Sequence, residues 1–228
     1  VVEDWPLLEK INQEKELIGM YLTAHPLDRF RPEMKSYCNT DLYTINSNLQ
    51  NYKGREISFA GIVKSFKSGI SQSNNRQFGI AEMEDYTDTY QLRLWGNDFV
   101  NYKNFFSPGI ALLIKGIVEE WTSKKDGRTG IEFRVKSIHM LSELRKDVIR
   151  TVILTIPLDT ITEEMIEALQ NFIVIPEKTN QAKQLRIKIV DNSTNHKVDL
   201  FSRNKYVDIS DKFFEYIEGN SEIDYMFK

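Results

Sequence analysis

Residues 78–95 read FGIAEMEDYTDTYQLRLW, two short runs of alternating apolar and polar residues on either side of an acidic segment. Alternation with a period of two is typical of β-strands, because successive side chains point to opposite faces. The pattern predicts strands over residues 77–84 and 90–95, joined by a tight turn over 86–89. In the second strand, Tyr90, Leu92 and Leu94 are expected to point inward, and Gln91, Arg93 and Trp95 outward.

The flanking sequence extends this pattern into a barrel. A strand is predicted over Glu56–Lys64 with a bend at Ala60–Gly61, followed by a long flexible loop over Phe66–Arg76 that is rich in Ser and Asn. Beyond residue 95 we expect a helix over 98–106, strands over 110–119 and 131–138, and between them a hairpin turn at 124–128 with an Asp-Gly signal. Five short strands with a helix between the third and the fourth are the order of an OB-fold.

The first 53 residues are expected to be mainly helical. Leu17, Ile18, Tyr21 and Leu22 recur at three- and four-residue steps, which predicts one apolar face of a helix running from Leu7 to about Ala24. His25-Pro26 is expected to end it, because proline disfavours helical geometry at the preceding residue. A short helix over 32–37 and an Asn-rich connector over 46–51 follow.

The last third predicts a small α+β domain. Strands are expected over 151–157, 184–191, 197–201 and 223–227, and helices over 162–172, capped by Thr162, and 211–216. The fold class is therefore mixed α/β and multidomain. Its expected parts are a helical segment and connector over 1–53, a five-stranded OB-fold barrel over 54–146, and an α+β partner-binding domain over 147–228.

Composition excludes several classes of protein. Hydrophobic residues make up 41% and charged residues 28% of the 228 residues, as in ordinary folded domains. No apolar run approaches the roughly 20 residues of a membrane span, and none resembles the apolar region of a secretory signal, so we expect neither. The single cysteine, Cys38, fits a reducing compartment, and three scattered histidines lack metal-ligand spacing. We expect a cytoplasmic protein without membrane contact, metal or cofactor, and the start at Val1 suggests a piece of a longer chain.

Charge is distributed unevenly along the sequence. Residues 54–146 carry 14 Lys and Arg against 11 Asp and Glu, whereas residues 147–228 carry 10 against 14. A modest positive excess favours nucleic acid as the partner of the barrel, and the acidic end favours a protein partner.

The expected ligand surface of the barrel is its second and third strands with the two flanking loops. Single-stranded nucleic acid is bound by cations that follow the phosphates and by aromatic faces that stack on bases. The alternatives are that Trp95 folds back under the barrel and that the 124–128 turn is merely solvated. The candidate nucleic-acid-binding residues are Lys67, Arg76, Gln91, Arg93, Trp95, Trp121, Lys124, Lys125 and Arg128.

No catalytic residue is expected. His25 has neither a nucleophile nor an orienting carboxylate in a recognisable motif, so we interpret it as the end of a helix. Glu82, Glu84 and Asp85 do not suggest a metal site, because adjacent residues of a strand point to opposite faces and Asp85 lies at the turn. The segment 68–71 lacks the lysine and the glycines of a phosphate-binding loop.

The segment EKELIGMYLTAHPLD, residues 14–28, resembles the Gly-x-Tyr-Leu-x-x-His-Pro-Leu pattern of the bacterial DNA polymerase III alpha subunit, a C-family replicative polymerase. The pattern falls on Gly19, Tyr21, Leu22, His25, Pro26 and Leu27. FAGIVKSF at 59–66, the opening stretch at 78–95 and LLIKGIV at 112–118 resemble the family's barrel strands in the same order. The resemblance is strong over 13–140 and loose after 147.

This resemblance implies the C-terminal, non-catalytic region of a DNA-directed DNA polymerase, whose active site lies in an upstream palm domain. The barrel would bind single-stranded template DNA, and the terminal domain would bind the tau subunit of the clamp loader. We expect the tau contacts on helix 162–172 and at Phe213 and Phe214, since adjacent aromatic residues cannot both face one core. The family's sliding-clamp segment lies upstream of residue 13, and no copy is found here. Ala24 replaces a common glycine, and the loop 67–76 is less basic than the family pattern.

Two other interpretations remain open at this point. An anticodon-binding barrel of a tRNA synthetase has the same strand order and would prefer structured RNA. A scaffold that binds only proteins would not depend on Arg93, Lys124 or Lys125.

Overall fold

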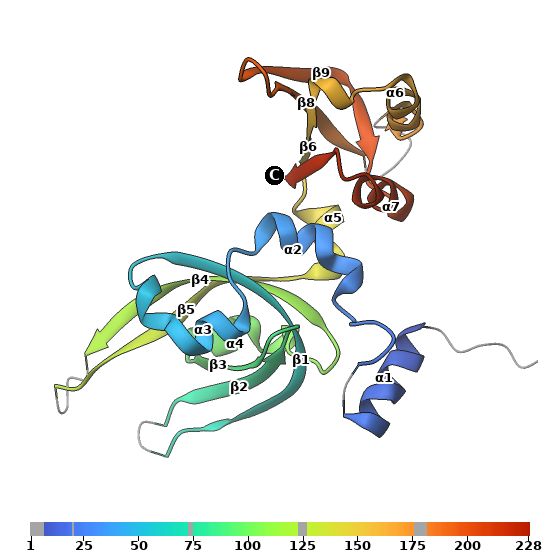
Figure 1. Ribbon diagram of the computed structural model, residues 1–228. Coiled ribbons are helices and arrows are strands. Elements are labelled where there is room, and N and C mark those ends of the chain that lie inside the picture. Colours follow the sequence, from blue (N-terminus) through green and yellow to red (C-terminus); the bar gives the residue numbers. More distant parts are fainter. Residues whose placement is uncertain (1–6, 20, 73–74, 123–126, 176–181) are drawn as a thin grey trace, which may run out of the picture. The chain divides into compact units, whose positions relative to one another are not determined.

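The computed structural model describes residues 7–19, 21–72, 75–122, 127–175 and 182–228. Contacts divide the chain into two compact units, Val1–Leu141 and Ser142–Lys228. Each unit has its own five-stranded sheet (Figure 1). No helix in the described ranges combines the length and the apolar composition that crossing a bilayer requires.

The first sheet is the predicted OB-fold barrel, with the antiparallel order β3-β2-β1-β4-β5. β1 pairs with β4 through its first half and with β2 through its second half, and Ile62 takes part in both. A helix lies between the third and fourth strands, as expected. The bounds are β1 Glu56–Ile70, β2 Gln77–Glu84, β3 Thr89–Trp95, α4 Asn97–Tyr102, η3 Lys103–Phe105, β4 Ala111–Thr122 and β5 Thr129–Met140.

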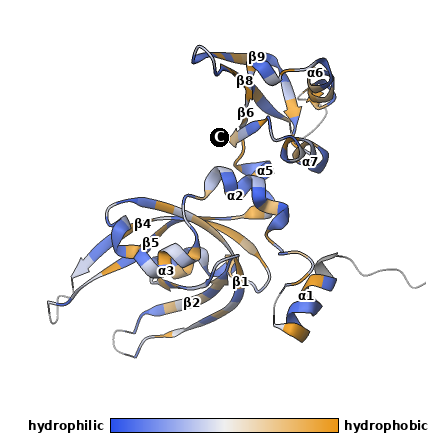
Figure 2. Ribbon diagram, viewed as in Figure 1, coloured by the Kyte–Doolittle hydropathy of each residue, from blue (hydrophilic) through white to orange (hydrophobic). Residues whose placement is uncertain are grey.

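The barrel closes around an apolar core in which the inward residues of all five strands meet. Phe59 is fully buried and packs near Tyr90 and Phe133, with ring centroids 5.9 and 5.4 Å away. Leu92 and Leu94 are buried while Gln91, Arg93 and Trp95 are exposed, so the predicted alternation of β3 is confirmed. Apolar and polar residues intermix along these strands accordingly (Figure 2).

Two details of β1 differ from expectation. The first five residues of the loop predicted over Phe66–Arg76 are strand, because β1 continues to Ile70 in register with β2. Ser68 and Gly69 suggested a loop, but the ladder to β2 pairs their backbone groups. The irregularity predicted at Ala60–Gly61 lies instead between Val63 and Ser65, just after Ile62, where β1 changes partner.

The N-terminal helices are shorter and more numerous than expected. α1 does not reach Ala24: it ends at Ile18, because Gly19 has φ +85° and donates its N–H to the Lys15 carbonyl. Leu17, Ile18 and Leu22 are exposed rather than packed. The connector expected over 46–51 is largely helical, starting at Asp41, whose carboxylate accepts from the Thr44 N–H at 2.7 Å. The bounds are α1 Leu7–Ile18, η1 Asp28–Phe30, α2 Arg31–Tyr37, α3 Leu42–Asn48 and η2 Leu49–Tyr52.

The second unit is an α+β domain with the sheet order β10-β6-β8-β9-β7. β6 and β8 are parallel and the other pairs antiparallel. Thr162 caps α6 as predicted, accepting from the Met165 N–H at 3.2 Å. The bounds are α5 Leu141–Asp147, β6 Thr151–Pro157, η4 Leu158–Thr160, α6 Glu163–Gln170, β7 Ile173–Val174, β8 Ala182–Asp191, β9 His196–Asp208, α7 Asp211–Gly219 and β10 Asp224–Phe227.

Phe213 and Phe214 on α7 are both buried, 0% and 4% exposed, so the reasoning that they could not both face a core was wrong. Successive helical side chains diverge by about 100°, and here each meets a different neighbour. Phe213 packs edge-on against Phe172, with ring centroids 5.4 Å apart, and Phe214 against Phe227 at 5.7 Å. Neither ring offers a surface to a partner.

Candidate nucleic-acid interface

The outward side chains of β1, β2 and β3 form two cross-strand rows on the outside of the barrel. In the first row Ile80 stands opposite Lys67 on one side and Arg93 on the other. In the second row Phe78 stands opposite Gly69 and Trp95. We call this surface the outer ladder; it consists of Lys67, Gly69, Phe78, Ile80, Arg93 and Trp95.

The aromatic row of the outer ladder has open ring surface. Phe78 and Trp95 have centroids 5.2 Å apart and planes inclined by 36°. A Cβ on Gly69 would stand 3.3 Å from the Phe78 ring, so the missing side chain lets that ring lie close to β1. Trp95 keeps 46% of its surface exposed and does not fold back under the barrel. A flat aromatic surface of this kind can stack on an unpaired base.

The cationic row lies directly beside the aromatic one. Lys67 and Arg93 are exposed, and neither forms an ion pair with any residue in the described ranges. Lys64, nearby on β1, lies 3.4 Å from Glu82 and 3.7 Å from Glu84. The charges of Lys67 and Arg93 are therefore available to an anion from outside, and Gln91, opposite Glu82, adds a polar group at the margin.

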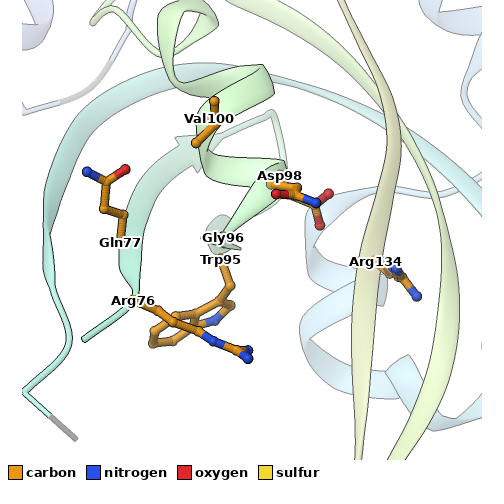
Figure 3. A pocket seen from close by; sticks show the side chains of 8 residues that line it. Arg76, Gln77, Trp95, Gly96, Asp98, Val100 and Arg134 are labelled. Atoms are coloured by element: carbon orange, nitrogen blue, oxygen red, sulfur yellow. The ribbon is translucent and has the colours of Figure 1, made fainter. Parts of the chain in front are cut away.

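A hollow of about 580 Å³ opens where β3 ends, and we call it the β3-end hollow. Trp95 and Arg76 form one side of it, Asp98 stands on the α4 side, and Arg134 of β5 lies on the opposite side (Figure 3). Its volume is within the range of about 300–1,000 Å³ that small-molecule sites occupy. Its lining residues are Arg76, Gln77, Trp95, Gly96, Asn97, Asp98, Val100 and Arg134.

The hairpin between β4 and β5 holds the remaining candidates. Trp121 stands opposite Gly130, where a Cβ would come within 2.7 Å of the indole, and keeps 41% of its surface exposed. Arg128 is exposed near the start of β5. Lys124 and Lys125 lie outside the described residues. In Figure 1 the β1–β2 and β4–β5 hairpins both extend from the same end of the barrel.

The structure thus brings Lys67, Arg93 and Trp95 onto one surface and places Arg76 beside Trp95. Sequence reasoning missed Phe78, Ile80 and Arg134. The first two could have been found by counting outward from the turn at 86–89, because Glu84 opposite Thr89 fixes Phe78 opposite Trp95. Arg134 reaches the hollow only through closure of the barrel, which no local pattern reveals.

His25 does not end a helix, contrary to the interpretation from sequence. It packs between Tyr21 and Tyr86, with ring centroids 4.9 and 4.4 Å away, and its Nδ1 accepts from the Leu27 N–H at 3.2 Å. Tyr86 in turn donates to Asp28 at 3.0 Å. These contacts fasten the segment after α1 to the β2–β3 turn.

We expect His25 to titrate below the ordinary histidine value of about 6.5. Burial lowers its pKa, with Lys15 acting the same way while Asp28 and Asp85 oppose. The folded state then binds fewer protons than the unfolded state, so its contribution to stability is present above pH 6.5 and declines as the pH falls. An NMR titration of the imidazole checks this. A titration midpoint above 6.5 would contradict this expectation. His25→Asn keeps a hydrogen-bond acceptor but cannot titrate. Its thermal stability should therefore depend less on pH than that of the wild type between pH 7.5 and 5.5.

Comparison with known proteins agrees with this architecture. Residues 152–228 match the family described as the DNA polymerase III alpha subunit, C-terminal domain, and residues 57–141 match the OB-fold nucleic acid binding domain. The alpha subunit of Borreliella burgdorferi is 26% identical over 143 residues, 63% of this chain, and that of Haemophilus influenzae is 25% identical over 164 residues, 71% of this chain. These matches show similarity to DNA polymerase III alpha subunits.

The similarity is to the C-terminal region of these subunits, and the matches span 12% and 14% of those two relatives. Among solved structures, the mitochondrial single-stranded DNA binding protein Rim1 of S. cerevisiae aligns with a TM-score of 0.29 and 16% identity, covering 39% of this chain and 94% of that one.

Proposed function

We propose that the barrel binds single-stranded DNA along the outer ladder, as part of a replicative polymerase of the alpha-subunit family acting in the cytoplasm. The observation that carries the proposal is the pairing of two rows on one sheet surface. Lys67 and Arg93 offer uncompensated charge next to the half-exposed ring of Trp95 and the partly buried ring of Phe78. Phosphates and bases of one strand alternate in the same way.

The geometry favours a single strand over a duplex. Bases in a duplex are stacked on one another, so a protein ring can reach their faces only after they are unstacked. The same rings could also take unpaired RNA, the alternative that an anticodon-binding barrel represents. The outer ladder alone does not discriminate between the sugars, so the experiment includes RNA.

Fluorescence anisotropy of a labelled oligo-dT tests the DNA-binding proposal. Four phosphate contacts, from Lys67, Arg76, Arg93 and Arg134, would give a slope of log K against log salt of about −3. We expect saturable binding with such a slope, displaced by unlabelled single strands and not by duplex. Stronger displacement by structured RNA would favour the anticodon-type alternative. Undetectable binding at low salt by a folded protein would refute the proposal.

We further propose that the second unit binds the tau subunit of the clamp loader through one open surface of its sheet. Ile187 stands opposite Leu200 and Ile189 opposite Val198, so these four side chains share a face. Val198 is 52% and Leu200 47% exposed. Contiguous exposed apolar surface of this kind is typical of interaction sites.

The apolar surface continues onto α6. A groove of about 220 Å³ runs between that helix and the sheet, where Ile187 and Ile189 contribute to its floor. Part of the helix named from the sequence, 162–172, thus belongs to the proposed surface, whereas buried Phe213 and Phe214 do not. The groove is lined by Ile156, Ile161, Met165, Ile166, Leu169, Gln170, Ile173, Leu185, Ile187 and Ile189.

We expect Leu200→Asp to weaken tau binding at least tenfold, because it places a charge in the middle of the apolar face. Calorimetric titration with purified tau measures the change. Asn195→Asp is the matched control: it adds the same charge at the β8–β9 turn, where φ is +57° and Asp is tolerated. Equal affinity of Leu200→Asp and the control would exclude this surface.

A further inference from the structure

The β3-end hollow contains an acidic group that binding to phosphate does not explain. Asp98 is half-buried in its lining, yet its carboxylate forms no hydrogen bond or ion pair with any residue in the described part of the chain. Arg134, across the hollow, lies 3.5 Å from Glu119 instead. A free carboxylate repels the phosphates of DNA, so a ligand group that lies against Asp98 must donate a hydrogen bond to it.

A nucleobase supplies such a donor. We propose that the β3-end hollow takes one base of the bound strand and that Asp98 selects for bases with an exocyclic amine over thymine. This inference rests on the proposed DNA binding and adds base preference to it. The half-exposed indole of Trp95 provides the stacking face, and Arg76, beside it in Figure 3, is placed to hold the adjoining phosphate.

The discrimination follows from hydrogen-bonding patterns. An ionised carboxylate only accepts hydrogen bonds. Cytosine presents its N4 amine as a donor, whereas thymine presents the O4 oxygen at the equivalent position. Asp98 would therefore accept a hydrogen bond from the N4 amine of cytosine and repel the O4 oxygen of thymine. Thymine differs from cytosine in its C5 methyl group as well as at this edge, so the contribution of Asp98 is the part of the preference that Asp98→Asn removes.

Gln77 and Asn97 complete the polar lining. Their side-chain amides form no hydrogen bonds with other described residues. An amide can donate and accept, so these two groups adapt to either pyrimidine and leave Asp98 as the discriminating group.

The test compares oligo-dC with oligo-dT of equal length at pH 7.5 and fixed salt, for the wild type and for Asp98→Asn. We expect the wild type to bind oligo-dC roughly tenfold more tightly, as one correct base contact allows. Asp98→Asn should bring the two affinities within about twofold, mainly by improving the binding of oligo-dT, since the amide can donate to O4.

Glu132→Gln is the control for charge alone. Glu132 lies exposed on β5 outside the hollow, and its replacement removes the same charge from the barrel. Glu132→Gln should raise the affinity for both oligonucleotides equally and leave the ratio of the two affinities unchanged. A wild-type ratio near one, or a ratio that survives Asp98→Asn, would overturn the base preference while leaving single-strand binding intact. No binding of either oligonucleotide would instead refute the proposed function, and the inference with it.

Discussion

Gly116→Ala is expected to destabilise the barrel by about 3 kcal/mol, at the upper end of what overpacking costs. A Cβ at this position would stand 2.2 Å from the carbonyl oxygen of Arg134 and 2.5 Å from the ring of Phe133. Gly116 pairs with Ile57 on one side and Val135 on the other, next to the irregularity between Lys115 and Gly116. Because the backbone oxygen is held by the sheet, the strands must separate to admit one methyl group.

Thermal unfolding followed by circular dichroism measures this effect, which corresponds to a fall in Tm of roughly 10 °C for a unit of this size. Gly130→Ala is the matched control on the adjacent strand. Its Cβ would also be too close to a neighbour, at 2.7 Å, but that neighbour is the half-exposed indole of Trp121, which can swing into solvent. We expect it to cost less than a third as much. An equal fall in Tm for the two variants would show that the backbone contact at Gly116 is not the cause of the destabilisation.

Trp95→Ala is expected to raise the Kd for single-stranded DNA by roughly 5- to 150-fold, the equivalent of about 1–3 kcal/mol for one stacked base. Trp95 is the ring that the outer ladder and the β3-end hollow share, so its loss removes the stacking face from both. Since its side chain is half exposed, the barrel should unfold at nearly the wild-type temperature. Anisotropy at one salt concentration gives the change in affinity.

The salt dependence separates stacking from charge. Trp95→Ala should leave the slope of log K against log salt unchanged, whereas Arg93→Ala should reduce its magnitude by about 0.7. Trp95→Phe should recover part of the affinity, because it restores a ring. Tyr43→Ala removes an exposed ring from α3, away from the outer ladder, and should have no effect on DNA affinity. If Trp95→Ala bound DNA as well as Tyr43→Ala does, the outer ladder would not be the binding surface.

Much of the fold could be predicted from local pattern. The strand at 77–84 has the bounds of its alternating pattern, and the strand at 151–157 has the bounds of its apolar run. The helix after Thr162 starts where this capping residue predicts. Errors arose where a local signal competed with pairing. The polar residues of 66–70 were taken for a loop, but β2 offers their backbone a complete ladder. At Gly19 a left-handed backbone ended α1 seven residues before the proline that was expected to end it.

The candidate site likewise has residues that could be predicted from local pattern and residues that could not. Gln91, Arg93 and Trp95 could be assigned to the outside of the barrel from residue type and strand order, because a period of two fixes which side chains share a face. Lys67 was expected in a loop, and the structure places it on β1 instead. By contrast, Phe213 and Phe214 were misjudged, since burial on a helix depends on which neighbours surround it.

The sequence by itself determined the order of strands, the alternation within each strand and the resemblance to the polymerase family. Only the tertiary structure decided which outward residues meet: β1 changes partner at Ile62, and closure of the barrel brings Arg134 to the same hollow as Trp95 and Asp98. The physical reason is that alternation is a property of one strand, whereas neighbourhood across a barrel depends on the register of every strand pair in between.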